Sequence, residues 1–353
     1  MSAEGRSGAI RVAIAGLDHW YTGLAAAGAA AKLPDVELII GHRDRAHAEE
    51  TAARFGAIEV TTDFTSLARR DDIDILITAC RSSDNPDVCI EAARHGMNII
   101  SVKPFATTRG DAERVRDAVQ RAGVLFFPWE SAQRLGDRYR AIEGWMDEGR
   151  IGQPVSAAYV MRAHVPRIPW PGESGDTWWL DPAHVPGGGW IDHAIYAVDS
   201  MRGLFGAEVS SIGGIVARLV DPSLAPALED YGVATLMMTS GAGASIEVTW
   251  TAAQGAFYET MQIVGTEGSI VAGTDNPGRA TLIGNVAPFE GRVETALPRR
   301  DDNAVAAMIR AMRDGEELPA GIDDACRNLD ACLTFYEAAA AGRTVKVPQG
   351  DRS

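Results

Sequence analysis

The sequence predicts a two-domain α/β protein: a doubly wound parallel sheet, then an α+β domain with a large, mainly antiparallel open sheet. Short apolar runs alternate with helical periodicity through the first third of the chain. After about residue 127, segments appear in which every second residue is apolar. The length of 353 residues also favours two domains, because single cores stop growing below this size. We therefore place the domains at 1–127 and 128–353.

The first domain is predicted from strands and helices that alternate along the chain. The expected strands are Ile10–Ala15, Val36–Ile40, Ile73–Ala79, Asn98–Val102 and Val124–Phe127. The expected helices are an Ala-rich helix ending near Lys32, followed by Arg45–Phe55, Pro86–His95 and Asp111–Arg121. Strand–helix alternation at this spacing implies a parallel sheet with helices on both faces.

The second domain is predicted from period-2 segments and flanking helices. The segments are Tyr231–Met238, Ser245–Trp250 and Thr260–Val264, with Gly-rich turns between them. The expected helices are Asp137–Asp147, Asp302–Arg313 and Asp323–Ala341. Alternating apolar and polar residues are typical of an antiparallel sheet with one covered face.

Composition excludes several classes of protein. Lys and Arg number 33 against 48 Asp and Glu, and the net charge of −15 argues against nucleic-acid binding. No apolar run approaches the roughly 18 to 20 residues that span a bilayer. The polar start Met1–Ala9 has no signal-peptide pattern, and the four cysteines form no CxxC pair. We expect a soluble, cytoplasmic protein that binds no membrane.

The turn after the first strand has part of a dinucleotide-binding fingerprint. Gly16 occupies the first glycine position of G-x-G-x-x-G, whereas Asp18 and Tyr21 replace the other two. A carboxylate that faces a pyrophosphate repels it, unless Asp18 caps the following helix and points away. An ordinary capped turn is the alternative interpretation.

The end of the second predicted strand bears on the choice of cofactor. An NAD site usually has an acidic residue here, whereas this chain has His42 and Arg43, which suit a 2′-phosphate. This favours NADP over NAD, and NAD stays open. A solvated Arg43 at the start of a helix is the other interpretation.

Five separated segments together resemble the Gfo/Idh/MocA oxidoreductase family, in the family's order and over nearly the whole chain. They are Asp74–Arg81, Ile99–Pro104, Gly187–Asp199, Gly265–Ser269 and Ala338–Pro348. The resemblance implies a dinucleotide-binding Rossmann domain at 1–127 and a substrate-binding and oligomerisation domain at 128–353. It implies cofactor contacts from Gly16, Asp18, His19, Trp20, His42, Arg43, Cys80, Arg81, Lys103 and Pro104.

Lys103 corresponds to the family's catalytic lysine, in the segment that resembles E-K-P. The chain has only three lysines, so a lysine here suggests that the chemistry needs an amine. A surface lysine is the alternative, but Lys103 ends a predicted buried strand at the edge where such sheets bind ligands. Val102 replaces the family's glutamate, so one polar contact near the cofactor is missing.

Asp192 corresponds to the family's substrate-binding aspartate, and Tyr196 stands where the family usually has histidine. This resembles the glucose–fructose oxidoreductase, dihydrodiol dehydrogenase and sugar ketoreductase branch, where a phenol serves as acid or base. Asp192 and Tyr196 are four residues apart, so both side chains lie on one face of the predicted helix. A phenolate would need a nearby ammonium such as Lys103. Tyr196 as a packing residue is the alternative, and His193 is a second candidate substrate contact.

The region between these elements is rich in tryptophan. Six of the eight tryptophans lie between Trp129 and Trp190. The flat faces of tryptophans such as Trp178 and Trp179, together with hydrogen-bonding groups such as Arg162 and His164, suit a sugar or cyclitol as substrate. The alternative is that these tryptophans fill a core or a subunit interface. The histidines here lack metal-binding spacing, so we expect no metal.

The combined expectation is an NAD(P)-dependent dehydrogenase or reductase acting on a secondary alcohol or ketone of a sugar-like substrate. Lys103, Tyr196 and Asp192 are the expected catalytic residues. The resemblance implies a homodimer or homotetramer. Two alternatives stay open: a redox-assisted lyase or glycosidase with a tightly bound cofactor, and a non-catalytic sensor or co-regulator. The altered turn at Asp18 and Tyr21 favours the sensor, whereas the three retained polar residues oppose it.

Overall fold

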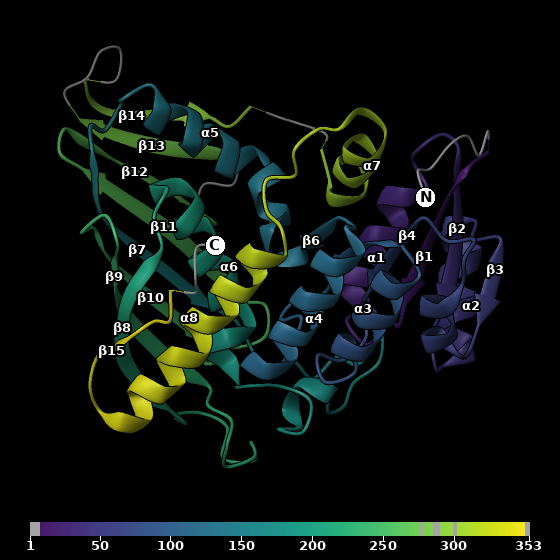
Figure 1. Ribbon diagram of the computed structural model, residues 1–353. Helices are drawn as coiled ribbons and strands as arrows, with labels where there is room; N and C mark the ends of the chain where they lie inside the picture. Colours follow the sequence, from purple (N-terminus) through teal and green to yellow (C-terminus); the bar gives the residue numbers. More distant parts are fainter. Residues whose placement is uncertain (1–7, 276–277, 285–289, 299–301, 350–353) are drawn as a thin grey trace. The chain divides into compact units, whose positions relative to one another are not determined.

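The computed structural model describes residues 8–275, 278–284, 290–298 and 302–349 (Figure 1). The chain divides into two compact units. One comprises Met1–Trp129 with Asp302–Ala325, and the other Glu130–Asp301 with Cys326–Ser353.

The first unit contains, among its described residues, a sheet of six parallel strands in the order β3-β2-β1-β4-β5-β6. The strands are β1 (Ile10–Ala15), β2 (Val36–Gly41), β3 (Glu59–Thr61), β4 (Ile75–Thr78), β5 (Asn98–Ser101) and β6 (Phe126–Pro128). The predicted doubly wound parallel sheet is thus confirmed. The alternation pattern did not predict β3, because a strand of three half-buried residues has no measurable periodicity.

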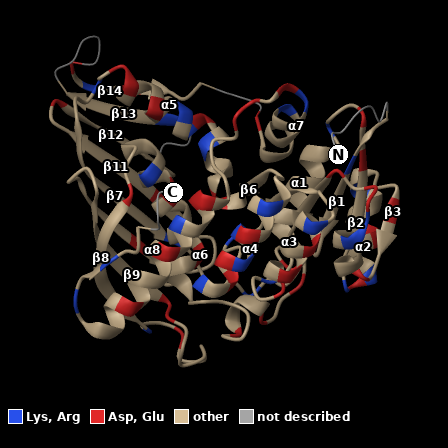
Figure 2. Cartoon of the chain, viewed as in Figure 1, with Lys and Arg blue, Asp and Glu red and all other residues tan. Residues whose placement is uncertain are grey.

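Helices cover this sheet, and their caps follow from local sequence. They are α1 (Trp20–Ala30), α2 (Arg45–Phe55), α3 (Asn85–Arg94), α4 (Arg109–Ala122) and α7 (Ala304–Asp314), with a 3₁₀ helix η1 (Phe64–Arg69). The Asp44 carboxylate caps α2 by accepting from the His47 N–H, and Thr108 caps α4 in the same way. Figure 2 shows acidic and basic residues interleaved along α3 and α4, where Arg114 pairs with Asp111.

The segment Asp302–Ala325 differs from the predicted domain division. We assigned it to the second domain, but it clusters with the first, because α7 packs against α1 and β5. Local periodicity cannot predict a contact between segments that lie so far apart along the chain.

The second unit, as far as it is described, is built on a sheet of nine strands in the order β14-β13-β12-β11-β7-β10-β9-β8-β15. These are β7 (Pro154–Arg162), β8 (Val209–Ala217), β9 (Tyr231–Met238), β10 (Gly243–Thr249), β11 (Tyr258–Gly265), β12 (Gly268–Gly273), β13 (Arg279–Gly284), β14 (Gly291–Ala296) and β15 (Val345–Lys346). All neighbours are antiparallel except β7 and β10. The predicted open, mainly antiparallel sheet is confirmed.

One face of this sheet is covered by helix α6 (Gly189–Phe205), which packs against β9 and β10. Two further helices are α5 (Asp137–Asp147) and α8 (Ile322–Ala341), with the 3₁₀ helices η2 (Trp129–Leu135) and η3 (Trp178–Leu180). Trp190 of α6 stacks on Phe335 of α8 with ring centres 3.8 Å apart, and both side chains are fully buried. This packing fixes α6, which carries Asp192 and Tyr196. No described helix combines the length and apolar character that a bilayer crossing needs.

Candidate functional site

The turn after β1 passes very close to the segment that follows β4. Gly16 has φ +84°, and a Cβ there would lie 2.7 Å from the Cys80 Cα. Glycine is therefore required on both steric and conformational grounds. A turn of this kind before a helix, at the carboxyl edge of a parallel sheet, is where dinucleotides bind, and these residues fit one.

Asp18 does not cap helix α1, contrary to one of the expectations above. The N-cap residue is His19, whose side chain does not cap the helix. The Asp18 carboxylate is only 7% exposed and accepts from the Arg81 guanidinium at 3.3 Å and from Arg43 at 3.5 Å. Burial raises the pKa of Asp18, and the charges of Arg43 and Arg81 oppose this rise. Asp18 is thus held in an ion cluster.

The two residues after β2 do not present the groups that an NADP site needs. The buried His42 ring accepts the Leu17 N–H on Nδ1 at 3.0 Å, and burial, with the Arg43 charge, lowers its pKa to about 4. His42 is therefore neutral at pH 7. Arg43 pairs with Asp84 at 2.8 Å. The NADP preference expected from the sequence gains no support from these contacts.

His19 and Trp20 lie where the helix begins. The fully buried His19 donates its backbone N–H to the Ala79 carbonyl at 2.9 Å. Its ring meets Tyr21 edge-on at 5.2 Å, and Trp20 meets Tyr21 similarly at 5.7 Å. These contacts tie the start of α1 to the end of β4.

The Lys103–Pro104 segment follows β5 at the same sheet edge and has a cis peptide bond. Lys103 is fully buried. The buried Asn85 donates to the Ser101 hydroxyl at 2.9 Å and to the Phe105 carbonyl at 2.6 Å, and so joins both sides of this segment. The sequence pattern does not single out Asn85, because an asparagine at a helix start is usually only a cap.

Cys80 and Arg81 follow β4, beside the Gly16 turn. Burial raises the pKa of the Cys80 thiol well above its ordinary value, so this thiol stays protonated. The Arg81 guanidinium bonds Asp18, as described above.

In the second unit, helix α6 presents Asp192, His193 and Tyr196. The nearly buried Asp192 accepts the Trp250 indole N–H at 3.1 Å, and the His193 Nδ1 lies 3.1 Å from the same carboxylate oxygen. Burial raises the pKa of the Tyr196 phenol well above 10, and the charges of Asp192 and Glu130 raise it further. Tyr196 is therefore a proton donor at neutral pH rather than a phenolate.

The start of α6 is held by Glu229. Its carboxylate accepts the Gly188 N–H at 3.0 Å, the Trp190 N–H at 2.9 Å and the Tyr336 hydroxyl at 2.8 Å. A Cβ on Gly188 would lie 2.3 Å from the Glu229 carbonyl oxygen, which explains a glycine there. The sequence pattern does not indicate that Glu229 and Trp250 contact α6, because both lie far from this helix along the chain.

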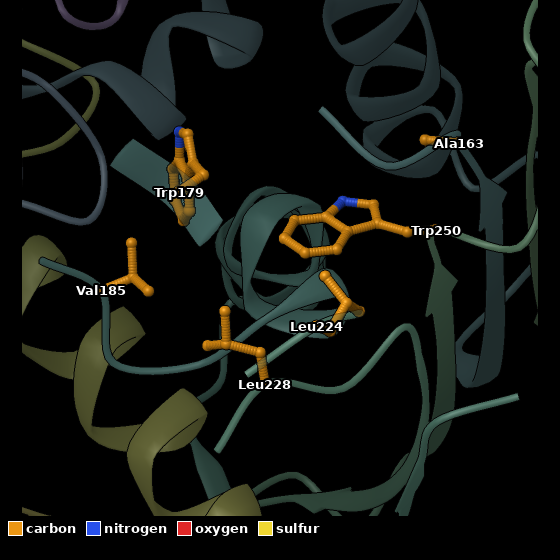
Figure 3. Packing of buried hydrophobic residues seen from close by; sticks show 6 residues of the cluster. All are labelled: Ala163, Trp179, Val185, Leu224, Leu228 and Trp250. Atoms are coloured by element: carbon orange, nitrogen blue, oxygen red, sulfur yellow. The ribbon is translucent and has the colours of Figure 1, made fainter. Parts of the chain in front are cut away.

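The tryptophan-rich segment forms a small apolar core (Figure 3). Its buried members are Ala163, Trp179, Val185, Leu224, Leu228 and Trp250. Trp178 is half-buried and stacks on Trp179 with ring centres 4.7 Å apart. Trp179, only 4% exposed, serves this core, so of the two only Trp178 retains appreciable surface for a ligand.

The other two expected substrate contacts lie at the end of β7. Arg162 bonds the Glu247 carboxylate at 3.0 Å on an exposed surface. His164 is half-buried and forms an isolated bridge with Thr251. Among the described residues, no group of three or more histidine, cysteine or acidic side chains gathers as metal ligands would.

Two family models match this chain. Residues 10–129 match an oxidoreductase family with an NAD-binding Rossmann fold, and residues 139–271 match the GFO/IDH/MocA C-terminal domain. The chain belongs to the Gfo/Idh/MocA family of oxidoreductases.

Individual proteins that resemble this chain share only 21–28% of its residues in the examples that follow. Scyllo-inositol 2-dehydrogenase (NAD(+)) of Bacillus subtilis is 26% identical over 71% of this chain and 70% of its own length. A 2,7-anhydro-N-acetylneuraminate hydratase of Mediterraneibacter gnavus is 28% identical over 45% of this chain and 41% of its own. Levoglucosan dehydrogenase, solved with NADH and L-sorbose, has a TM-score of 0.84 at 21% identity, covering 97% of this chain and 100% of that one. The last comparison shows a shared fold.

Proposed function

We propose that this protein is a nicotinamide-dinucleotide-dependent dehydrogenase or reductase. It transfers a hydride between the cofactor and a carbon of a sugar or cyclitol that bears a secondary alcohol or ketone. The observation that carries the proposal is the buried Lys103, which follows β5 at the same carboxyl edge of the parallel sheet as the Gly16 turn after β1. The names of the inositol and levoglucosan dehydrogenases support a polyol substrate.

The bound cofactor supplies hydride exchange, and the chain supplies orientation and proton transfer. The Asp192 carboxylate accepts a hydrogen bond from a substrate hydroxyl. In reduction, the protonated Tyr196 phenol and Lys103 ammonium donate to the carbonyl oxygen as it gains charge. In oxidation, the substrate hydroxyl donates its proton to whichever of these two groups is unprotonated.

The first experiment is a titration of the purified protein with NADH and NADPH, followed by calorimetric heat and nicotinamide fluorescence. A denatured sample is analysed for released cofactor. We expect at least one dinucleotide to bind with a micromolar Kd, which corresponds to a binding free energy of about −8 kcal/mol. Absence of both binding and released cofactor contradicts the proposal.

The second experiment tests the lysine. Lys103→Met is expected to lower turnover of scyllo-inositol or levoglucosan by about 10² to 10⁴, the usual contribution of an acid–base group. Lys32→Met is the matched control, because Lys32 is exposed. Equal turnover in both variants argues against the proposed mechanism.

The hydratase named among the relatives favours one alternative: transient oxidation of the substrate, with elimination or addition and re-reduction. A cofactor that is released only by denaturation, with no net turnover of added NADH, supports this alternative.

A further inference from the structure

Residues 167–176 form a loop between β7 and η3 whose two ends meet, and we call it the Arg167 loop. The Gly175 N–H donates to the Arg167 carbonyl at 3.1 Å, and the Arg167 guanidinium forms an ion pair with Asp176. Trp170, inside the loop, is only 4% exposed. The Arg167 loop is therefore closed at its base and carries a buried ring.

The Arg167 side chain also joins this loop to the segment that follows β8. It donates to the Asp221 carboxylate at 2.8 Å and to the Ser223 hydroxyl at 2.8 Å. Hydrogen bonds from Ser223 and Arg167 lower the pKa of Asp221 to about 2, so this carboxylate is ionised at neutral pH. An arginine suits such a junction, because its donors point to several partners from one planar group.

The segment after β8 is itself held by a buried carboxylate. The fully buried Asp230 accepts three successive backbone N–H groups, those of residues 219–221, at 2.7 to 2.8 Å. The Asp230 carbonyl accepts the Trp250 N–H at 2.7 Å, and the Trp250 indole bonds Asp192. A connected set of hydrogen bonds therefore links Arg167 to Asp192 through the second unit.

Both flanks of the Arg167 loop lie on the apolar core that contains Trp250 (Figure 3). Val165 on one side and Trp178 on the other pack against the buried members of this core. Asp192, the proposed acceptor of a substrate hydroxyl, bonds the same Trp250. The loop therefore starts and ends on the core that supports Asp192.

We propose that the Arg167 loop forms one wall of the polyol site, and that Arg167 is a positioning residue that holds this wall in place. The half-buried Trp178 at its end suits the C–H face of a ring polyol. A wall that is fixed before binding spares the polyol the entropy cost of ordering it. The inference rests on the proposed function, since it presumes a polyol beside Asp192.

Steady-state kinetics of Arg167→Met tests the proposal, with scyllo-inositol or levoglucosan and a saturating concentration of the dinucleotide that the wild type binds. We expect KM to rise at least about fivefold, the upper effect of a partly exposed ion pair, while kcat and dinucleotide affinity change by less than about twofold. Arg167→Lys keeps the charge without the planar group, and should restore part of the loss.

Arg310→Met is the matched control. The Arg310 side chain is 37% exposed against 38% for Arg167, and it also pairs with two carboxylates, those of Asp302 and Glu316. It lies on α7 in the first unit, so we expect KM to stay unchanged. Equal KM values in the two methionine variants overturn the inference while a wild type that turns the polyol over leaves the proposed function standing.

Asp221→Asn removes the charge of the other partner and keeps its shape. We expect a similar rise in KM. The double variant Arg167→Met/Asp221→Asn should rise no further than the larger single effect, because both changes remove one interaction. Effects that multiply in the double variant would mean that the two residues act independently, and would contradict a shared role in holding the loop.

Cleavage after the exposed Glu173 by a glutamate-specific protease reports on the loop without turnover. We expect cleavage at least about fivefold faster in Arg167→Met than in the wild type or Arg310→Met, and protection of the wild type by polyol with dinucleotide. Equal rates in all three proteins overturn the role of Arg167. Absence of protection in a wild type that turns the polyol over overturns the wall. A wild type that neither binds a dinucleotide nor turns over a polyol contradicts the proposed function itself.

Discussion

At the scale of single residues, the side chains that orient a candidate catalytic group matter as much as the group itself. Asp192 accepts the indole N–H of Trp250, which is 1% exposed and belongs to the apolar core that the tryptophan-rich segment builds. The carboxylate therefore depends on a hydrogen bond from a rigid, desolvated donor. We infer that Trp250 is a positioning residue that acts through Asp192.

Trp250→Phe keeps an aromatic ring and removes this N–H. We expect the KM for the polyol to rise by about tenfold to a hundredfold, the range for a hydrogen bond to a charged group, with NADH affinity unchanged. Trp190→Phe is the matched control: Trp190 is equally buried, but its indole N–H donates to the Ile246 carbonyl. Similar KM changes in both variants would assign Trp250 a purely structural role.

At the scale of elements, the start of helix α6 depends on a carboxylate from another part of the chain. The first helical N–H groups have no partner within the helix. Glu229 satisfies two of these donors, from Gly188 and Trp190, and also accepts from Tyr336. The helix that bears Asp192 is therefore fixed at the end nearest that residue.

This arrangement predicts a pH dependence of stability. Burial raises the pKa of Glu229 above its ordinary 4.5, so the folded chain binds this proton more tightly than the unfolded chain. The contribution of Glu229 to the free energy of unfolding therefore falls as pH rises from about 4.5 through the raised pKa. Glu229→Gln removes the titration. Urea unfolding of both proteins from pH 4 to pH 8 should show this slope only in the wild type; parallel curves would contradict it.

At the scale of the whole molecule, the nine-stranded sheet carries exposed apolar side chains. Ile215 of β8 is 58% exposed and Met237 of β9 is 46% exposed, and the register of the two strands places both on the same face of the sheet. Exposed apolar residues on one face of a sheet are typical of an interface between subunits. These residues favour the homo-oligomer that the family resemblance implies, and we propose that this face forms its interface.

Met237→Glu tests the oligomer, because a charge in the middle of an apolar interface is not compensated. We expect light scattering to show a dimer or tetramer for the wild type and a smaller species for this variant. Glu294→Gln is the control, at a charged, exposed position on β14. A wild type that is monomeric at micromolar concentration contradicts the proposal.

The sequence by itself determined the order of most elements and which of them carry candidate site residues. Apolar periodicity, capping residues and helix-ending glycines are local properties, so Arg45–Phe55 and Tyr231–Met238 begin and end as predicted. The candidate residues Lys103, Asp192 and Tyr196 were identified by motif, and their roles remain proposals.

Only the tertiary structure decided which groups meet. It placed α7 in the first unit, paired Arg43 with Asp18 and Asp84, and brought Trp250 to Asp192. Each of these contacts joins residues that are far apart along the chain. Periodicity and spacing describe neighbours within a few turns, so they carry no information on such pairs. The motif after β2 shows that Arg43 is present, but only the fold shows that its charge is already paired with Asp18 and Asp84.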